Sequence, residues 1–281
     1  MAAAGVPANP FDALGDSIAH MIESLGPMSI AGEKAGEFER VGMFDASLTT
    51  YTLWFIIAAI LLVVLVMVFK KKQQEGGLVP RGRFVNAMEM MFEFVRKDIV
   101  DGAISHNGKK HLPFVATVFF FVFINNFLGL VPGFKAGTGV IAGTAAISIA
   151  VFLYFNYQGI KEKGIGKYIV GLVPDGVPKV IWPVIWLIEL VSLFLRPITQ
   201  ALRLFANMYA GHIMLGIFAT LTELFVRSAI QHVAPLTSLP GLAWLLLLTV
   251  LYLLEILVAA IQAYVFALLT AVYIDSATSA H

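Results

Sequence analysis

The sequence predicts an all-α integral membrane protein with five membrane-crossing helices, and three observations lead to this fold class. Of its 281 residues, 59% are hydrophobic and only 13% are charged, whereas soluble domains are about one-quarter charged. The apolar residues gather in long blocks that match a bilayer core of about 30 Å. Basic residues gather in two of the segments between these blocks.

The expected spans are about 51–69, 112–131, 138–157, 184–226 and 241–273. The first would be about 28 Å long as a helix, which fits the bilayer core. The last would measure about 50 Å, and the fourth is longer and contains Pro197. Because an overlong span tilts or kinks, we expect these two to form an antiparallel hairpin of steeply tilted helices.

The segments around the spans predict an orientation. Residues 1–50 are polar and rich in acids, so we expect an extracytoplasmic N-terminal segment ahead of a membrane domain over 51–281. Residues 84–100 mix apolar and charged residues at helical spacing, which predicts an amphipathic helix in the membrane interface. The basic segments 70–111 and 158–182 fall on one side, which the positive-inside rule makes cytoplasmic. The N-terminus is then outside and the C-terminus cytoplasmic.

Arg203 is the sharpest candidate for function, since it lies well inside an apolar run. A charge within a membrane segment is costly and is a functional candidate by default. Arginine does not deprotonate in proteins, so it cannot carry protons, but it can attract a carboxylate and repel passing cations. The alternative is an internal ion pair with Glu189 or Glu255.

The register of the hairpin favours a partner outside the chain. The turn at 227–240 is centred near residue 233, so facing residues have numbers that add to about 466. This rule pairs Arg203 with Gln262 and His212 with Glu255. At about 100° per residue, Arg203 and His212 point to opposite sides of their helix, so His212 can face Glu255 while Arg203 faces outward.

Polar residues make a stripe along the fourth span at three- and four-residue steps: Glu189, Ser192, Arg196, Thr199, Arg203 and Asn207. The stripe indicates a wet path, although interhelical hydrogen bonding explains Ser192 and Thr199 equally well. His212 with Glu255 is a candidate proton-entry pair, because histidine titrates near neutral pH; a structural hydrogen-bonded pair is the alternative. Glu189 is a candidate for the exit side, with a snorkelling acid as its alternative.

Other polar residues carry weaker expectations. Asn125 and Asn126 in the second span are expected to hydrogen-bond another helix, and Gly211 to let a helix approach closely. The five histidines other than His212 are expected in solvated loops or tails. The sequence has no cysteine, phosphate-binding glycine loop or helical His-Glu-x-x-His. We therefore expect no cofactor or metal site, and a net charge of +1 gives no reason to expect nucleic acid.

Two segments carry a family resemblance. Residues 201–212 (ALRLFANMYAGH) closely resemble the signature of subunit a of F-type ATP synthases. Residues 255–273 (EILVAAIQAYVFALLTAVY) match a second stretch of that family, and residues 126–132 and 183–197 are weaker matches. The similarity runs from about residue 48 to 276. It implies a stator subunit that stands beside a rotating ring of c subunits, each with a membrane-embedded acid.

The resemblance also implies a role for the charge. Arg203 matches the family's essential arginine, which faces the ring carboxylate, and Gln262 matches its polar neighbour. A ring carboxylate facing lipid must be neutral, but beside Arg203 the anion is favoured. Rotation would then load a proton from one half-channel and release it to the other, with Arg203 separating the two. ATP chemistry would occur on other subunits, so this chain would be non-catalytic. Gly129 replaces an acid of some members and is assigned no role.

Further positions follow from the resemblance. Asn207, His212 and Glu255 match the outer half-channel, and Glu189 and Ser192 match positions near the inner one. The acid and histidine of the outer pair are exchanged relative to many bacterial members, as in mitochondrial members. A bacterial plasma (inner) membrane is the expected location, with the mitochondrial inner membrane as the alternative. The expected partners are the c-ring, the peripheral stalk b subunits and the lipid bilayer.

Two other function classes make different predictions. A secondary transporter or stand-alone channel would show inverted repeats with paired broken helices, and the sequence has no such repeat. An intramembrane enzyme would need a nucleophile and a base on facing helices, and no such pair stands out. The sequence therefore favours an ion-translocating stator subunit, with the proton as the expected ion.

Overall fold

The structure is a computed structural model that describes residues 50–76, 82–105, 107–131, 134, 136–173, 178, 180–231 and 238–279. The regular elements in these residues are all helices, and five of them are long and apolar enough to cross a membrane. The predicted fold class is therefore confirmed. The expected N-terminal segment lies outside the described residues except for Thr50, the first residue of a helix.

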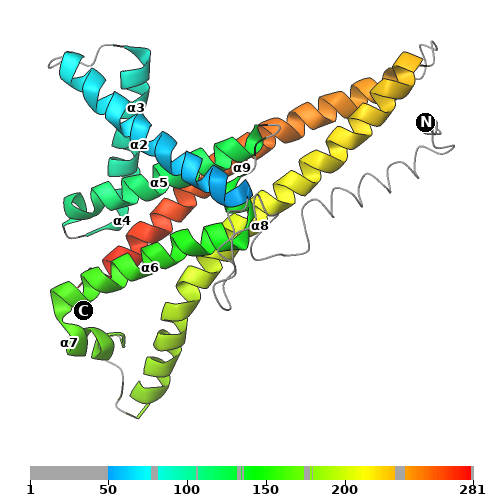
Figure 1. The fold of residues 1–281 in the computed structure, drawn as a ribbon. Helices are drawn as coiled ribbons and strands as arrows, with labels where there is room; N and C mark the ends of the chain where they lie inside the picture. Colours follow the sequence, from blue (N-terminus) through cyan, green and yellow to red (C-terminus); the bar gives the residue numbers. More distant parts are fainter. Residues whose placement is uncertain are drawn as a thin grey trace, which may run out of the picture.

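The five long helices are α2 (Thr50–Gly76), α5 (Gly108–Leu130), α6 (Ile141–Lys163), α8 (Trp182–Gln231) and α9 (Ser238–Thr278) (Figure 1). Each overlaps one predicted span, but most extend beyond it. Hydropathy shows where the apolar stretch ends, whereas a helix continues through lysine and glutamate because both are good helix formers. The helix α2, for example, runs on past Lys70–72.

The helices α8 and α9 pack side by side as an antiparallel hairpin that extends beyond the other helices (Figure 1). They contain 50 and 41 residues, or about 75 and about 60 Å at 1.5 Å per residue. Both lengths exceed a bilayer core of about 30 Å, so upright crossing is excluded for straight helices. The helix α8 also bends in its N-terminal half (Figure 1), and Pro197 lies inside it.

The helix α9 is the centre of the packing, because it contacts α8, α5 and α6. Four alanines at four-residue intervals form one face of α9, and each is fully buried: Ala259, Ala263, Ala267 and Ala271. Small side chains let helix backbones approach closely in membranes. This face therefore explains how three helices pack around the C-terminal half of α9.

The predicted interfacial helix is present in three parts: α3 (Arg83–Phe94), a π-helical segment η1 (Val95–Val100) and a short α4 (Asp101–Ala103). Val85 and Met88 on α3 are buried. On its outer side, Lys97 Nζ lies 2.6 Å from Glu93 Oε1, and the hydrogen bond from Lys97 lowers the pKa of the Glu93 carboxyl. The helix is thus amphipathic as expected, and its place in a membrane interface stays a prediction.

The expectation for His111 was wrong, because this side chain is fully buried. The helix α5 begins at Gly108, four residues before the predicted span, and this extension carries His111 into the protein. There, His111 Nδ1 lies 3.1 Å from the Tyr154 hydroxyl of α6. The same tyrosine ring stacks on Phe114 with ring centres 3.6 Å apart, so an aromatic contact between α5 and α6 covers the histidine.

Candidate functional site

The register of the α8–α9 hairpin determines which candidate residues of the two helices face each other. Gln200 Nε2 of α8 donates a hydrogen bond to the Phe266 carbonyl of α9 at 3.1 Å. Farther along, a Cβ added to Gly211 would overlap the Glu255 carboxylate. The residue numbers of both pairs add to 466, the value expected from the turn midpoint. The predicted register is therefore confirmed at two points, 11 residues apart on each helix.

Arg203 lies on the outward face of α8. Its side chain is exposed, while Leu204 beside it is 1% exposed and faces the protein core. Among the described residues, no ion pair or hydrogen bond reaches Arg203. Glu255 lies beside Gly211, eight residues farther along α8, and Glu189 lies 14 residues earlier. The internal ion pair is therefore absent in this part of the chain.

Asn207 and Gln262 lie near Arg203 but differ in their surroundings. Asn207 follows Arg203 by one helical turn, and its Nδ2 atom is buried with no hydrogen-bond partner among the described residues. A buried amide without a partner costs free energy, so a water or another polar group is expected there. Gln262 is half-buried on α9, and the confirmed register puts it level with Arg203.

Two glycines leave the space that the side chains of the pair His212 and Glu255 occupy. Glu255 is 6% exposed, and its carboxylate occupies the space left by the missing side chain of Gly211. His212 turns toward α5, where its Nε2 atom lies 3.2 Å from the position that a Gly129 Cβ would take. The two side chains thus lie at one level of the hairpin but against different neighbours, with no hydrogen bond between them among the described residues.

Polar groups of α5 extend this region toward the loop after α5. Asn126 Nδ2 donates to the Ala259 carbonyl of α9 at 3.2 Å, which confirms the expected bond to another helix. Thr138, in the 3₁₀ turn η2 (Gly137–Gly139), donates to Asn126 Oδ1 at 3.1 Å. Because Ala259 is one turn from Glu255, these groups make a buried polar region beside the acid. Asn125 instead bonds within its own helix, to the Phe121 carbonyl.

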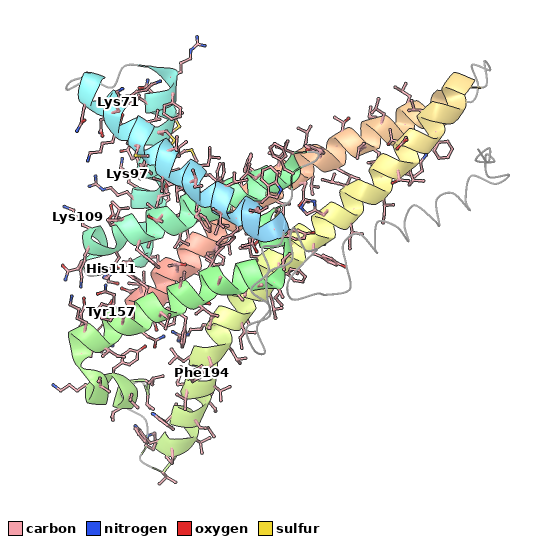
Figure 2. All side chains as sticks on the ribbon, in the orientation of Figure 1. Lys71, Lys97, Lys109, His111, Tyr157 and Phe194 are labelled. Carbon is pink, nitrogen blue, oxygen red and sulfur yellow. The ribbon has the colours of Figure 1, made fainter. Side chains whose placement is uncertain are left out.

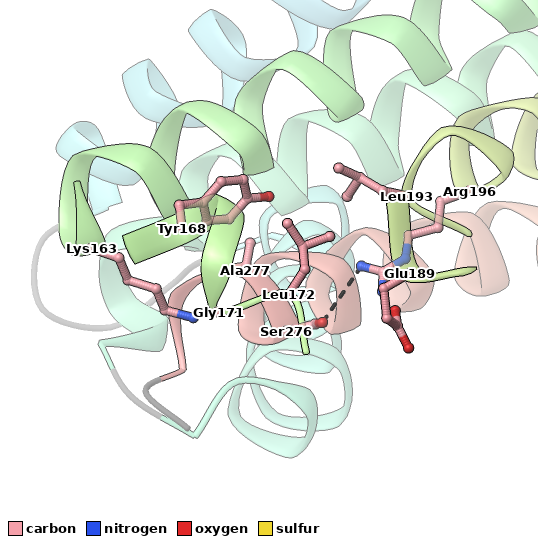
Figure 3. Close-up of a pocket in the computed structure, with 9 residues that line it drawn as sticks. All are labelled: Lys163, Tyr168, Gly171, Leu172, Glu189, Leu193, Arg196, Ser276 and Ala277. Atoms are coloured by element: carbon pink, nitrogen blue, oxygen red, sulfur yellow. Dashed lines mark hydrogen bonds between the residues drawn. The ribbon is translucent and has the colours of Figure 1, made fainter. Parts of the chain in front are cut away.

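A second polar region lies at the other end of α8, where a cavity of about 190 Å³ is surrounded by α8, α9 and the segment after α6 (Figure 3). Glu189 and Arg196 line it from α8. Arg196 Nη1 lies 3.5 Å from Ser276 Oγ of α9, and its guanidinium lies over the Tyr273 ring at 5.4 Å. Ser192 is half-buried and is not among the lining residues.

The sequence reasoning missed three polar residues of this cavity: Lys163, Tyr168 and Ser276. They come from α6, from α7 (Ile165–Val170) and from α9, so no spacing within one segment could reveal them. The Tyr168 hydroxyl donates to Asn156 Oδ1 at 2.9 Å, and burial raises the pKa of the Tyr168 phenol. Gly159 leaves room for the Tyr168 ring, because a Cβ there would press into it.

Comparison with known families decides the relationship of this chain. The family model described as ATP synthase A chain matches residues 52–275. The chain belongs to this family. The match includes every candidate residue described above except Ser276, which lies one residue beyond its end.

Individual relatives agree with the assignment to the ATP synthase A chain family. "ATP synthase subunit a" of Parvibaculum lavamentivorans is 35% identical over 237 residues, 84% of this chain and 87% of the relative. The proteins of the same name from Bradyrhizobium diazoefficiens and Chelativorans sp. are 40% and 42% identical, over 71% and 72% of this chain and 78% of each relative. These relatives are bacterial, and the chain is a multi-pass membrane protein by its five long apolar helices.

Proposed function

We propose that this chain is the proton-translocating stator subunit of an F-type ATP synthase, in which Arg203 separates two offset half-channels. The observation that carries the proposal is the position of Arg203: a permanent charge, exposed on the outward face of a membrane-crossing helix, without an ion pair in the described part of the chain. Such a charge requires an anionic partner, and a carboxylate on a neighbouring ring of c subunits, with Gln262 beside it, meets that need.

The two half-channels would lie on opposite sides of Arg203 along α8. We assign Asn207, His212 and Glu255 to the outer path, together with the buried polar region around Asn126. We assign Glu189 and Ser192 to the inner path, which would open through the cavity beside Arg196. His212 and Glu189 are 23 residues apart, about 35 Å along a helix. Arg203 lies between them, so neither path needs to cross its charge.

Ion movement would follow from where a ring carboxylate is charged. Facing lipid, the acid must be neutral, because desolvation penalises the anion; beside Arg203 the anion is favoured. Each carboxylate would accept a proton from the outer path and release one to the inner path as the ring turns. A unit charge crossing about 100 mV yields about 2.3 kcal/mol, so several protons would be needed for each ATP made elsewhere in the complex.

The orientation and partners belong to the same proposal. Lys71, Lys97 and Lys109 lie along one edge of the molecule (Figure 2), and a basic edge favours the cytoplasmic side of a bacterial plasma membrane. The N-terminus would then be outside and the C-terminus cytoplasmic. The mitochondrial inner membrane is the alternative location. The c-ring and the peripheral stalk b subunits would be the partners within the complex.

Replacing Arg203→Ala in the intact synthase tests the proposal. Proton-driven ATP synthesis in membrane vesicles should fall at least about a hundredfold, since the two paths would no longer be separated by a fixed charge. The complex should still assemble, because Arg203 forms no hydrogen bond or ion pair in the described part of the chain. The matched control is Leu202→Ala, the exposed neighbour, which should keep most of the activity. Synthesis at the wild-type rate in the Arg203→Ala variant would rule out the assigned role.

A second experiment separates the stator subunit from a stand-alone channel or secondary transporter. The chain, purified under mild conditions from its own membrane, should carry a ring of c subunits with it. A chain that conducts protons after reconstitution alone, and that never co-purifies with such a ring, would favour the channel.

A further inference from the structure

An apolar groove of about 500 Å³ lies between α3, α5 and α9, and it shares no lining residue with the cavity beside Arg196. None of its eight lining side chains carries a charge. Its main walls are Met90 and Phe94 of α3, Phe119 and Phe123 of α5, and Ile261 and Tyr264 of α9. The Phe94 ring contacts both other walls, with ring centres 6.2 Å from Phe119 and 5.6 Å from Tyr264. The groove is therefore a built feature of three helices and not a gap beside one.

The size of the groove favours a slender occupant. An α-helix with its side chains is about 10–12 Å across, so a volume of about 500 Å³ holds only about one turn of a helix. An extended hydrocarbon chain is much thinner and can fill the same volume along its length. The groove also belongs to a membrane protein, and the acyl chains of lipids are the most abundant apolar groups in a membrane.

A positively charged residue closely follows, in the sequence, the part of α3 that lines the groove. Lys97 follows the groove-lining Phe94 by three residues and lies within the π-helical segment. Among the residues that the structure describes, its ammonium group forms one ion pair, with Glu93, although it carries three protons that can be donated. The side chain is 66% exposed and lies at the basic edge of the molecule (Figure 2). It can therefore still donate to the phosphate of a lipid headgroup.

We propose that this groove binds one acyl chain of a phospholipid, whose phosphate contacts Lys97. Met90 and Phe94 then cover the chain from the amphipathic helix, while α5 and α9 form the other walls. The site would tie α3 to the spanning helices through a lipid. None of its lining residues is among those assigned to the proton paths.

Photo-crosslinking in the intact membrane complex tests the lipid site. The complex is reconstituted in phosphatidylcholine vesicles that contain a small fraction of phosphatidylcholine with a diazirine midway along one chain. After irradiation, mass spectrometry should find labelled peptides containing Met90, Phe94 and Tyr264 well above the level at Ile60. Ile60 is a suitable reference, since it is an apolar side chain of α2 that is 57% exposed and does not line the groove.

Two pairs of variants make the test specific. Ala260→Phe adds a ring inside the groove and should lower labelling at Met90 about tenfold, because the ring displaces several methylene groups. The matched Ala59→Phe change on α2 should leave it unchanged. Lys97→Gln should lower labelling about two- to fivefold, the effect of one exposed ionic contact, whereas Lys71→Gln should not.

Three outcomes would overturn the proposal. Labelling of the groove at the Ile60 level would show that lipid has no preference for it. Labelling that Ala260→Phe leaves unchanged would place the chain elsewhere. Crosslinks from Met90 to a helix of another subunit, in place of lipid, would make the groove a protein interface.

Discussion

Two arginines on one helix face have opposite surroundings. Arg196 and Arg203 are seven residues apart on α8, which is two turns and nearly the same direction. Arg196 lies over the Tyr273 ring and near Ser276, beside a cavity. Arg203 is exposed and has no partner among the described residues. The comparison shows that the residues of one polar stripe can have different surroundings: the chain itself packs around the first charge and leaves the second exposed.

The largest expected difference between the two arginines is their tolerance of lysine. Lysine loses its proton readily in a poorly solvated site, whereas arginine stays charged. Arg203→Lys should therefore lower proton-driven ATP synthesis by about ten- to a hundredfold, because lysine also lacks the two-pronged contact that arginine makes with a carboxylate, and losing a hydrogen bond to a charged group costs about 1.5–3 kcal/mol. Arg196→Lys, beside a polar cavity, should keep the rate within about fivefold. Equal losses in the two variants, measured in the same vesicles, would remove the distinction.

The next test concerns the outer region, where two small residues differ in burial. Gly211 is buried against the Glu255 carboxylate, while Ala210 is exposed. Gly211→Val should displace the Glu255 carboxylate from its buried position and cost about 1–3 kcal/mol, the range for overpacking. Ala210→Val should change stability by less than about 0.5 kcal/mol. Thermal unfolding of the purified complex measures both, and similar midpoints would mean that the helices are less tightly packed here.

A disulfide test can sharpen the register at the same place. The chain has no native cysteine, so an introduced pair has no competing thiol in this subunit. Gly211→Cys with Glu255→Cys should crosslink under mild oxidation, because disulfides need Cα atoms about 4.4–6.8 Å apart. Arg203→Cys with Glu255→Cys, shifted by eight residues, should not. Preferential crosslinking of the shifted pair would mean that the hairpin has a different register.

The smallest expected effect lies in the wall of the inner cavity. Tyr168→Phe removes the hydrogen bond to Asn156 and should cost about 1 kcal/mol at neutral pH. Burial raises the pKa of the Tyr168 phenol, so the folded state favours the protonated form. This contribution is complete below the ordinary tyrosine pKa of about 10 and is lost as pH rises through the folded-state value. Unfolding measured against pH should therefore show the two proteins converging at alkaline pH.

The amino-acid sequence by itself determined the membrane-crossing helices and the pairing of the last two. Long uncharged blocks can be recognised without tertiary information, because their length and hydropathy are local properties. The register of this pair, in which facing residues have numbers that add to about 466, followed from the turn position alone, and the hydrogen bond from Gln200 to the Phe266 carbonyl confirms it. The outward direction of Arg203 followed from helix periodicity in the same way.

Only the tertiary structure decided which neighbours the buried polar groups meet. His111 was expected in solvent, but α5 begins earlier and Tyr154 of another helix covers it. His212 and Glu255 lie at the same level of the α8–α9 hairpin. However, His212 packs against Gly129 of α5, whereas Glu255 packs against Gly211 of α8. The direction of a side chain within a bundle depends on the free space that other segments leave, and residues distant in sequence create that space.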